Sequence, residues 1–340
     1  MHFCFINDIE KNFHMKIKLV LISLLVISAC NCVGQGSDSL MVMFWNMENF
    51  FDHTDGGEGE SDKEFSSMGS RHWSRKRFYA KCNSFAKSVL WLSDEYGKIP
   101  DLIGLAEIEN SNVLYRLIHD TVLRKTDYSF IHFDGRDRRG IDVAILYRKS
   151  VMSPESITRK VPVFNGDTLD TRDILHVRMA LKGHLEPRSI DFIVNHHPSK
   201  FGGEKASEGR RNAAMTCLKD LCDSLLHSGL KSDGVIAMGD FNDTPDSAPF
   251  DIIEGILYNK GLKLYENGRG TIRYEGKWEL IDMFLTSKDL YGRSVMEIVE
   301  IPFLMVRDTR HSGMKPFRTY SGPRYIGGVS DHCPIILRVY

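Results

Sequence analysis

Short apolar runs alternate along the chain with segments whose apolar residues recur at helical spacing. This periodicity predicts three helices, over 75–91, 113–122 and 210–226. In the first, spacings of three and four create one apolar face suited to cover a sheet, formed by Phe78, Cys82, Phe85, Val89 and Leu92. The stretch 52–71 is rich in Gly, Ser, Asp and Glu and predicts a mobile loop. Strand-like runs that alternate with helices are typical of an α/β protein.

Polar side chains stand at the ends of several strand-like runs. The run 235–238 is followed by Gly-Asp-Phe-Asn. Side chains two apart in an extended chain point the same way, so Asp240 and Asn242 are placed to hold one water and one phosphate. An ordinary turn is the alternative, since Asp, Asn and Pro are turn formers. Four other segments carry such polar residues beside an apolar run: Asn46 with Glu48, Glu107, His196, and Asp331 with His332.

These segments form an ordered series of motifs. In chain order they are Trp-Asn-x-Glu from Trp45, Ala106-Glu107, Asn195-His196, Gly-Asp-Phe-Asn from Gly239, Ile281-Asp282, and Ser-Asp-His from Ser330. With this series the chain resembles the endonuclease/exonuclease/phosphatase superfamily, which includes pancreatic deoxyribonuclease, abasic-site endonucleases, inositol polyphosphate 5-phosphatases and bacterial neutral sphingomyelinases. The segments 45–52 and 274–278 further resemble a secreted bacterial branch of nuclease-like hydrolases.

The resemblance implies an architecture that periodicity alone does not supply. It is an α/β fold, a four-layered sandwich of two packed mixed β-sheets flanked by helices, with the active site at one end. The 340 residues, 42% of them hydrophobic, are enough for one large core. No linker or repeat divides the chain, so we expect a leader over 1–36 and a single catalytic domain over 37–340.

The beginning of the chain predicts export. Lys16 and Lys18 precede the apolar segment 19–29, which is too short for a bilayer that takes roughly 20 helical residues. It therefore indicates a signal peptide, with translation starting at Met15. The sequence before Cys30 fits a bacterial lipobox, which predicts a lipid anchor on Cys30 and an outer-surface or periplasmic lipoprotein. Ordinary cleavage a few residues later, which gives a secreted protein, is the alternative.

Charge and cysteine content limit the function classes. A net charge of −1 argues against a protein that holds nucleic acid mainly by a basic surface. It does not argue against an enzyme with a local positive site. Beyond the leader, four cysteines show no disulfide framework and are expected to be small, mostly buried thiols: Cys82, Cys217, Cys222 and Cys333.

Phosphodiester hydrolysis requires neutralised phosphoryl oxygens, an activated water and a stabilised leaving oxygen. Oxygen donors without thiolates favour Mg²⁺, or Mn²⁺ in its place. We expect Glu107 to be the principal metal ligand, aided by Asn46, Glu48 and Asp331. Arg139 is a candidate contact to the substrate phosphate, although a solvated charged loop is the alternative for its segment.

The remaining motif residues receive catalytic roles. Asp240 is expected to orient and deprotonate the attacking water, and Asn242 to donate to a phosphate oxygen. His332 as imidazolium would place positive charge on the phosphoryl group, and the resemblance makes Asp282 its partner. His196 would be a second donor to phosphate. For any histidine outside the motif series, a structural role is the expected alternative.

Three functions remain open at this point. The first is an exported nuclease, expected to be a monomer, that cleaves DNA or RNA. The second is a phosphatase or phosphodiesterase that acts on phospholipid head groups or small phosphate esters. The third is a non-catalytic binding module, which is disfavoured because every expected ligand and base is present. A continuous basic groove would indicate the first function, and a closed or apolar-rimmed pocket the second.

Overall fold

The computed structural model describes residues 39–57, 59–200 and 202–340. The predicted leader, the predicted start at Met15 and the predicted lipid anchor on Cys30 lie outside the described residues. In the part of the chain that is described, none of the helices has the length and apolar character needed to cross a bilayer. Residues 40–340 cluster into one compact unit.

The first sheet has six strands in the order β15-β20-β1-β2-β4-β3. The central pair β1 and β2 is parallel, and every other neighbouring pair is antiparallel. The sheet is therefore mixed, as predicted. Its strands are β1 (Leu40–Phe50), β2 (Leu102–Ile108), β3 (Tyr128–His132), β4 (Asp142–Arg148), β15 (Ser294–Ile298) and β20 (Ile335–Val339).

The second sheet also has six strands, in the order β11-β14-β10-β9-β8-β5. Here β9 and β10 are the parallel pair and the remaining pairs are antiparallel. Its strands are β5 (Met152–Lys160), β8 (Ile174–Leu181), β9 (Arg188–His196), β10 (Val235–Asp240), β11 (Tyr258–Asn259) and β14 (Asp282–Thr286).

Four two-stranded ribbons lie outside the two main sheets. They are β6 (Val163–Phe164) with β7 (Asp167–Thr168), β12 (Ile272–Tyr274) with β13 (Lys277–Glu279), β16 (Met305–Arg307) with β17 (Met314–Pro316), and β18 (Tyr320–Ser321) with β19 (Arg324–Tyr325).

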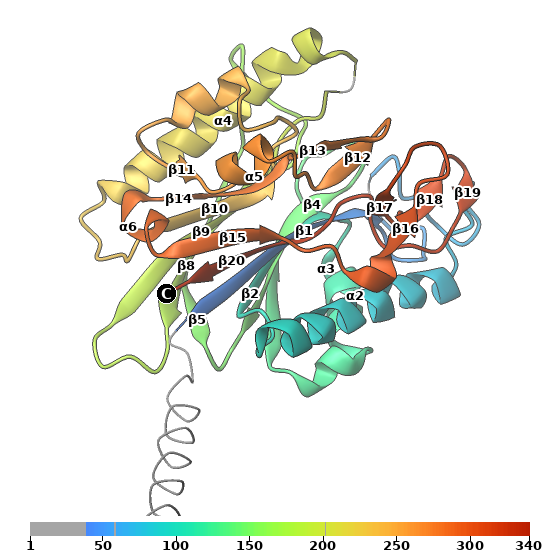
Figure 1. Ribbon diagram of the computed structural model, residues 1–340, viewed down its shortest axis with the longest axis horizontal. Coiled ribbons are helices and arrows are strands. Elements are labelled where there is room, and N and C mark those ends of the chain that lie inside the picture. The colour runs from blue at the N-terminus through green and yellow to red at the C-terminus, as the bar shows by residue number, and fades with distance from the viewer. Residues whose placement is uncertain (1–38, 58, 201) are drawn as a thin grey trace, which may run out of the picture. The chain divides into compact units, whose positions relative to one another are not determined.

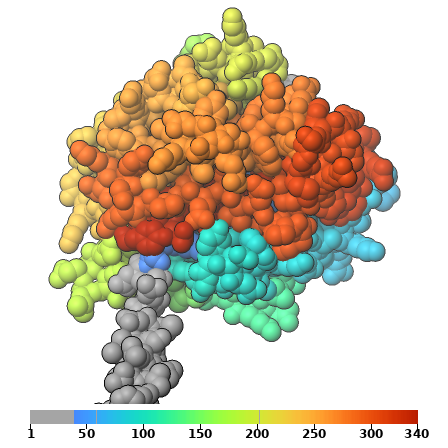
Figure 2. Space-filling model, viewed as in Figure 1, coloured from blue at the N-terminus to red at the C-terminus, as the bar shows by residue number. Residues whose placement is uncertain are grey.

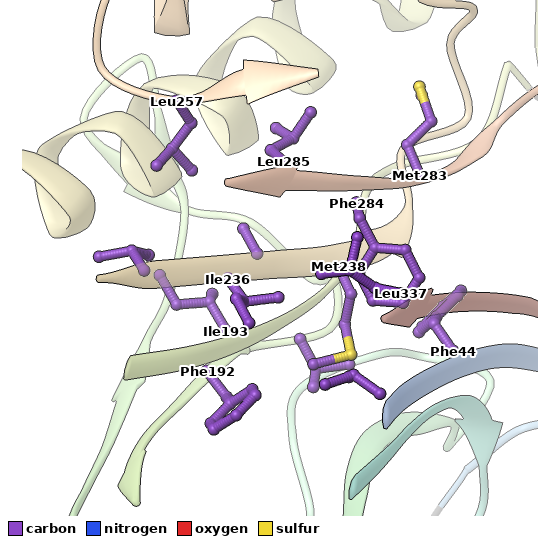
Figure 3. Close-up of a cluster of buried hydrophobic side chains, with 14 of the residues drawn as sticks. Phe44, Phe192, Ile193, Ile236, Met238, Leu257, Met283, Phe284, Leu285 and Leu337 are labelled. Atoms are coloured by element: carbon purple, nitrogen blue, oxygen red, sulfur yellow. The ribbon is translucent and has the colours of Figure 1, made fainter. Parts of the chain in front are cut away.

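The main core lies between the two sheets. Figure 3 shows Met238 and Phe284 from the second sheet close to Phe44 and Leu337 from the first, and all four side chains are buried. Burial of each such side chain contributes about 1.5–3 kcal/mol relative to exposure. The sheets approach each other closely at Gly104, where an added Cβ would lie 2.6 Å from the Met238 sulfur. Glycine therefore permits the packing that brings the two sets of strand ends together.

Helices cover the outer faces of both sheets, as Figure 1 shows. On the first sheet they are α2 (Arg75–Tyr96), α3 (Ser111–His119) and the 3₁₀ turn η1 (Val122–Lys125). On the second, α4 (Glu204–Leu226) buries Met215 and Leu218, which belong to the same hydrophobic cluster as the strands of that sheet. The shorter elements are α5 (Leu262–Glu266), α6 (Lys288–Tyr291), η2 (Ala248–Ile253) and η3 (Pro302–Leu304). The arrangement is the four-layered α/β sandwich that the sequence predicted.

The last third of the chain covers much of the face seen in Figure 2, where its orange and red residues predominate. The segment joining β15 to β20 runs from the first sheet out to the β16–β17 and β18–β19 ribbons and returns. This excursion carries the residues that lie directly before the Ser-Asp-His motif.

The three predicted helices are present, but their bounds differ. The helix predicted over 75–91 continues to Tyr96 and ends because Gly97 adopts a left-handed conformation (φ 76°) and bonds the Ser93 carbonyl. The one predicted over 113–122 begins earlier, because the Asn110 side chain accepts from the Val113 N–H, and it ends at His119. The third begins at residue 204 rather than 210. The prediction missed its first turns because they are too polar to show an apolar periodicity.

The described residues of 52–71 form a loop without helix or strand, as predicted, and parts of this loop are packed. The buried Asp62 carboxylate accepts backbone N–H groups of Gly56 and Gly57 at 2.9 and 2.7 Å. The ring of Phe65 stacks on Phe51 with centroids 4.8 Å apart. These contacts give the loop a defined conformation, and its mobility stays a prediction.

The four cysteines beyond the leader have the free thiols that the sequence predicted. Cys82, Cys222 and Cys333 are buried free thiols and Cys217 is half-buried, in agreement with the absence of a predicted disulfide framework.

Candidate active site

The predicted motif residues converge because the strands that carry them end at the same edge of the sandwich. Asp240 ends β10, where its neighbours across the sheet are His196 on β9 and Asp282 on the antiparallel β14. In the first sheet Asn46 pairs with the residue just before Glu107. Within each sheet, these residues, up to 60 positions apart in the sequence, therefore become neighbours.

Contacts between the two sheets join these side chains into one cluster. The Asn46 amide donates to the Asp240 carboxylate at 3.0 Å. The Nε2 atom of His196 lies 3.6 Å from Asp240 Oδ2 and 3.9 Å from Glu107 Oε1. Arg139 Nη1 lies 3.9 Å from the same Glu107 oxygen. The predicted base, phosphate donors and principal metal ligand thus share one site.

His332 and Asp282 form a buried ion pair. Nδ1 of His332 lies 2.7 Å from Asp282 Oδ2. Burial by itself would lower the pKa of His332. The charge and hydrogen bond of Asp282, followed by the charges of Asp240 and Asp331, outweigh burial and raise this pKa well above its usual value. The ring is therefore an imidazolium at neutral pH.

Asp240 has a raised proton affinity in the same cluster. Burial and the negative charge of Asp282 raise the pKa of Asp240 to about 7, against the opposing effects of His332 and two hydrogen bonds. Ligand atoms of Asp240, Asp282 and His332 lie within 4.8 Å of one another, which is close enough for a metal ion. The raised proton affinities of Asp240 and His332 suit the same group to acid–base chemistry.

The Ser-Asp-His segment is fixed to β1. The Ser330 hydroxyl donates to the Asn46 carbonyl at 2.6 Å and accepts from the His332 N–H at 3.0 Å. The Trp45 indole donates to the His332 carbonyl at 2.9 Å, and its ring stacks on Phe85 of α2 with centroids 5.8 Å apart. The serine and tryptophan of the two motifs therefore position the histidine.

Four site residues have left-handed backbone conformations without being glycine. They are Glu48, Asn49, Glu107 and Asn242, with φ between 46° and 62°. Each such conformation costs on the order of 1–3 kcal/mol, and such strain concentrates at functional sites. In β1 and β2 it coincides with an irregularity in strand register that redirects the polar side chains. No pattern in the sequence predicted these left-handed conformations.

Glu107 and Asp331 are suited to bind a hard cation. Glu107 Oε2 accepts the Asn49 N–H at 2.6 Å and Asp331 Oδ2 accepts from Arg318 at 2.9 Å. Among the described residues, the other oxygen of each carboxylate accepts no hydrogen bond, so both remain available. The side-chain oxygen of Asn46 accepts the Glu48 N–H at 2.9 Å and is, like the two carboxylates, an oxygen donor of the type that Mg²⁺ prefers.

Glu48, predicted as a metal ligand, is already engaged. Its carboxylate oxygens accept from Arg318 Nε at 3.2 Å and from the Thr319 N–H at 2.6 Å. Burial and the charge of Asp331 raise the pKa of Glu48 to about 7, against the opposing charges of Lys81 and Arg318. Glu48 thus anchors the segment before the Ser-Asp-His motif. A metal ion would have to displace Arg318 to bind the Glu48 carboxylate.

Asn242 and His196 differ in part from their predicted roles. One N–H of the Asn242 amide donates to the His197 carbonyl at 3.0 Å, which leaves the other for a phosphate oxygen. Its backbone N–H donates to Asp240 at 2.9 Å. Burial, followed by the charges of Arg172 and Arg139, lowers the pKa of His196 well below its usual value. The ring is therefore neutral and donates through one nitrogen only.

Two buried cations of the site were not identified from the sequence. Lys81 is 2% exposed, and its ammonium donates to the Glu48 carbonyl at 2.7 Å. The signal was present, because a lysine between Phe78 and Phe85 interrupts the apolar face of the helix. Arg172 is also buried and donates to Asp137 at 2.9 Å and to the His197 carbonyl at 2.7 Å. Nothing in its local sequence indicated this role.

The chain is similar to a known protein family and to several solved structures. A family model described as Endonuclease/Exonuclease/phosphatase family matches residues 41–340. A comparison with the curated proteins gives no match.

Among solved structures, an endonuclease/exonuclease/phosphatase family protein from Bacteroides thetaiotaomicron is similar at 16% identity and a TM-score of 0.54, covering 89% of this chain and 97% of its own. A mannosyl-6-phosphatase from the same organism has 15% identity and a TM-score of 0.55, covering 88% and 100%. D. rerio TDP2 complexed with single strand DNA product has 15% identity and a TM-score of 0.53, covering 89% and 100%. At these identities the likeness supports the fold.

Proposed function

The chain belongs to the endonuclease/exonuclease/phosphatase family, and from this premise we propose that it is an exported, metal-dependent phosphoesterase that hydrolyses phosphodiester bonds, with nucleic acid as substrate. Members of this family are phosphate-ester hydrolases. One observation carries the proposal: a buried carboxylate with a pKa of about 7, Asp240, lies beside the ion pair of His332 and Asp282. That combination supplies a base and a cation at one reacting centre.

The base of the proposed reaction is Asp240. Hydrogen bonds from the Asn46 amide and the Asn242 backbone hold its carboxylate in one orientation. A group with a pKa near the working pH accepts a proton from water most effectively. Asp240 would take the proton of the attacking water, while the imidazolium of His332 donates to a phosphoryl oxygen and the neutral His196 donates through Nε2.

Glu107 and Asp331, with the Asn46 amide oxygen, are the residues proposed to hold Mg²⁺ or Mn²⁺. When bound, the cation would neutralise phosphoryl charge and stabilise the leaving oxygen. Arg139 lies beside Glu107 and is 40% exposed, so its guanidinium can reach a substrate phosphate from the adjoining surface. The predicted contact between Arg139 and phosphate is part of the proposal.

Two observations favour nucleic acid. A hollow lined by four arginines adjoins the site. It supplies a local positive charge, which a protein of near-neutral net charge can still have. In addition, the TDP2 structure of the same fold holds a single-stranded DNA product. The alternative is a phosphatase or phosphodiesterase acting on head groups or small phosphate esters, a possibility kept by the likeness to a mannosyl-6-phosphatase.

A substrate panel tests the proposed function. The purified protein with Mg²⁺ or Mn²⁺ should cleave plasmid DNA or RNA faster than sphingomyelin, inositol phosphates or mannose 6-phosphate, and excess chelator should abolish cleavage. Rates are followed by product release for each substrate at equal concentration. Cleavage confined to a lipid or sugar phosphate would select the alternative, and no cleavage of any substrate would contradict both.

Export is the second part of the proposal, based on the leader sequence. In a bacterial host the full chain should appear in the membrane fraction and incorporate labelled palmitate, because the lipobox ends at Cys30. The Cys30→Ser variant should lose the label. Release of wild-type protein into the medium without label would instead indicate ordinary signal cleavage, and retention in the cytoplasm would contradict export.

A further inference from the structure

We propose that the arginine-lined hollow beside the active site binds a second, non-scissile phosphate group of the substrate. The hollow has a volume of about 620 Å³. This inference rests on the proposed phosphoesterase function and specifies its substrate class: a molecule that carries another phosphate near the bond to be cleaved.

Four separate segments form the hollow. The β3–β4 loop contributes Arg138 and Arg139, the β7–β8 loop contributes 168–172, the β9–α4 loop contributes 198–199, and α4 contributes Arg210. These segments come from both sheets, so the hollow depends on the complete fold. It has the concave form expected of a binding site for part of a small ligand.

The charges around the hollow favour an anion. Arg139 and Arg172 share one carboxylate, that of Asp137, at 3.4 and 2.9 Å. Within the described part of the chain, Arg210 makes no ion pair and no hydrogen bond. Asp170 is the one acidic residue of the lining, against four arginines. The balance is positive, and guanidinium groups suit phosphate oxygens through paired N–H donors.

Two buried donors of the lining lack partners. Thr171 is 4% exposed and its hydroxyl has no hydrogen-bond partner among the described residues. The Nε–H of Arg172, which is 5% exposed, is likewise unpartnered. A buried donor without a partner is unfavourable, because it has lost its hydrogen bond to water and gained none in return. Neighbouring donors that are both unsatisfied, in a positively charged hollow, point to an anionic ligand that satisfies them.

The hollow is connected to the reacting centre through its own residues. Arg139 lines it and also lies 3.9 Å from Glu107. Arg172 lines it and holds the carbonyl of His197, directly after His196. A substrate whose scissile phosphate lies among Glu107, His196 and Asp240 would therefore present its next anionic group to the hollow. A polynucleotide strand has such a neighbour, and so has a multiply phosphorylated small molecule.

The Arg210→Ala variant tests the inference with paired substrates. The first pair is a thymidine dinucleotide with and without an additional terminal phosphate. Wild-type protein should show a KM about tenfold lower for the phosphorylated form, and Arg210→Ala should lose this preference. Thr171→Val, which keeps the side-chain shape, should lose part of it. Lys219→Ala is the matched control, because it removes a cation from the same helix outside the hollow.

A second pair distinguishes the source of the phosphate. An inositol monophosphate and a bisphosphate are compared in the same way, and the pair that shows the Arg210-dependent preference identifies the substrate class. Equal KM values within both pairs for an active wild-type protein would overturn the inference and leave the proposed function intact.

A binding measurement keeps the two proposals separable. Wild-type protein should bind inorganic pyrophosphate in calorimetry about tenfold more tightly than Arg210→Ala. Binding that depends on Arg210 without turnover of any substrate would support the hollow and contradict the proposed function. Equal pyrophosphate affinity of the two proteins would contradict the hollow.

Discussion

Replacing Asp240 by Asn is expected to lower kcat/KM for phosphodiester hydrolysis by about 10³–10⁴-fold, because an amide cannot take the proton of the attacking water. The side chain keeps its size, so the circular dichroism spectrum should match that of wild type. Asp246→Asn is the control, since Asp246 is an exposed residue of the following loop whose carboxylate accepts from Thr244 at 2.6 Å and takes no part in the cluster. Activity of Asp240→Asn within tenfold of wild type would remove Asp240 as the base.

The pH dependence of the wild-type rate supplies a second readout of the same role. Burial and the charge of Asp282 raise the pKa of Asp240 to about 7, and the base form exists only above that pKa. The rate should therefore rise as pH increases through this value. A bound divalent cation shifts the rise to lower pH, because it stabilises the carboxylate. A rate that falls as pH increases from 5 to 7 would contradict the assignment.

Replacing His332 by Gln is expected to lower kcat by about 10²–10³-fold, because the reaction loses a preorganised cation at the phosphoryl group. Glutamine still donates a hydrogen bond but carries no charge. His311→Gln is the matched control, since His311 is exposed and outside the cluster. Equal kcat values for the His332 variant and wild type would show that His332 has a structural role only.

The partner variant Asp282→Asn reports on the ion pair. In wild type, Asp282 helps hold the pKa of His332 well above its usual value, so the imidazolium persists through neutral pH. Without the carboxylate, burial lowers that pKa. Activity of Asp282→Asn should then be lost at lower pH than in wild type as the solution becomes more basic. An unchanged alkaline limb would contradict the pairing as the source of the charge.

Much of the fold could be predicted because the motif series resembles a known family and the apolar periodicity is strong. Positions such as Phe78 and Phe85 on α2 fixed the helix and its buried face. The helix ends were less accessible. The left-handed Gly97 and the capping Asn110 act through backbone geometry that the apolar pattern does not contain.

The candidate site could be predicted as a set of residues but not as a set of contacts. The sequence named Asp240, Asn46 and His332, and the structure brings them together at a shared strand edge. The sequence did not reveal that the Glu48 carboxylate is held by Arg318, 270 positions away. Such long-range pairings depend on how the excursion between β15 and β20 folds back. Lys81 interrupts the apolar face of α2 in the sequence, but its partner, the Glu48 carbonyl on β1, is visible only in three dimensions.

The engagement of Glu48 also bears on how the site accepts a cation. Arg318 bonds Glu48 at 3.2 Å and Asp331 at 2.9 Å, so a guanidinium neutralises two of the predicted ligands. Glu107 is the carboxylate that no such short cationic contact neutralises, since Arg139 and His196 both lie 3.9 Å from it. Among the predicted ligands, Glu107 should therefore contribute most to cation affinity.

In the proposed mechanism, a divalent cation bound at Glu107 supports phosphodiester hydrolysis by this chain. This claim is tested most directly by the initial rate of cleavage of a phosphodiester as a function of Mg²⁺ concentration, for wild type and Glu107→Gln after chelation. Wild type should be inactive without Mg²⁺ and recover along a saturable curve, whereas the variant should need at least about tenfold more Mg²⁺. Full wild-type activity in chelator, or identical curves for the two proteins, would contradict the claim.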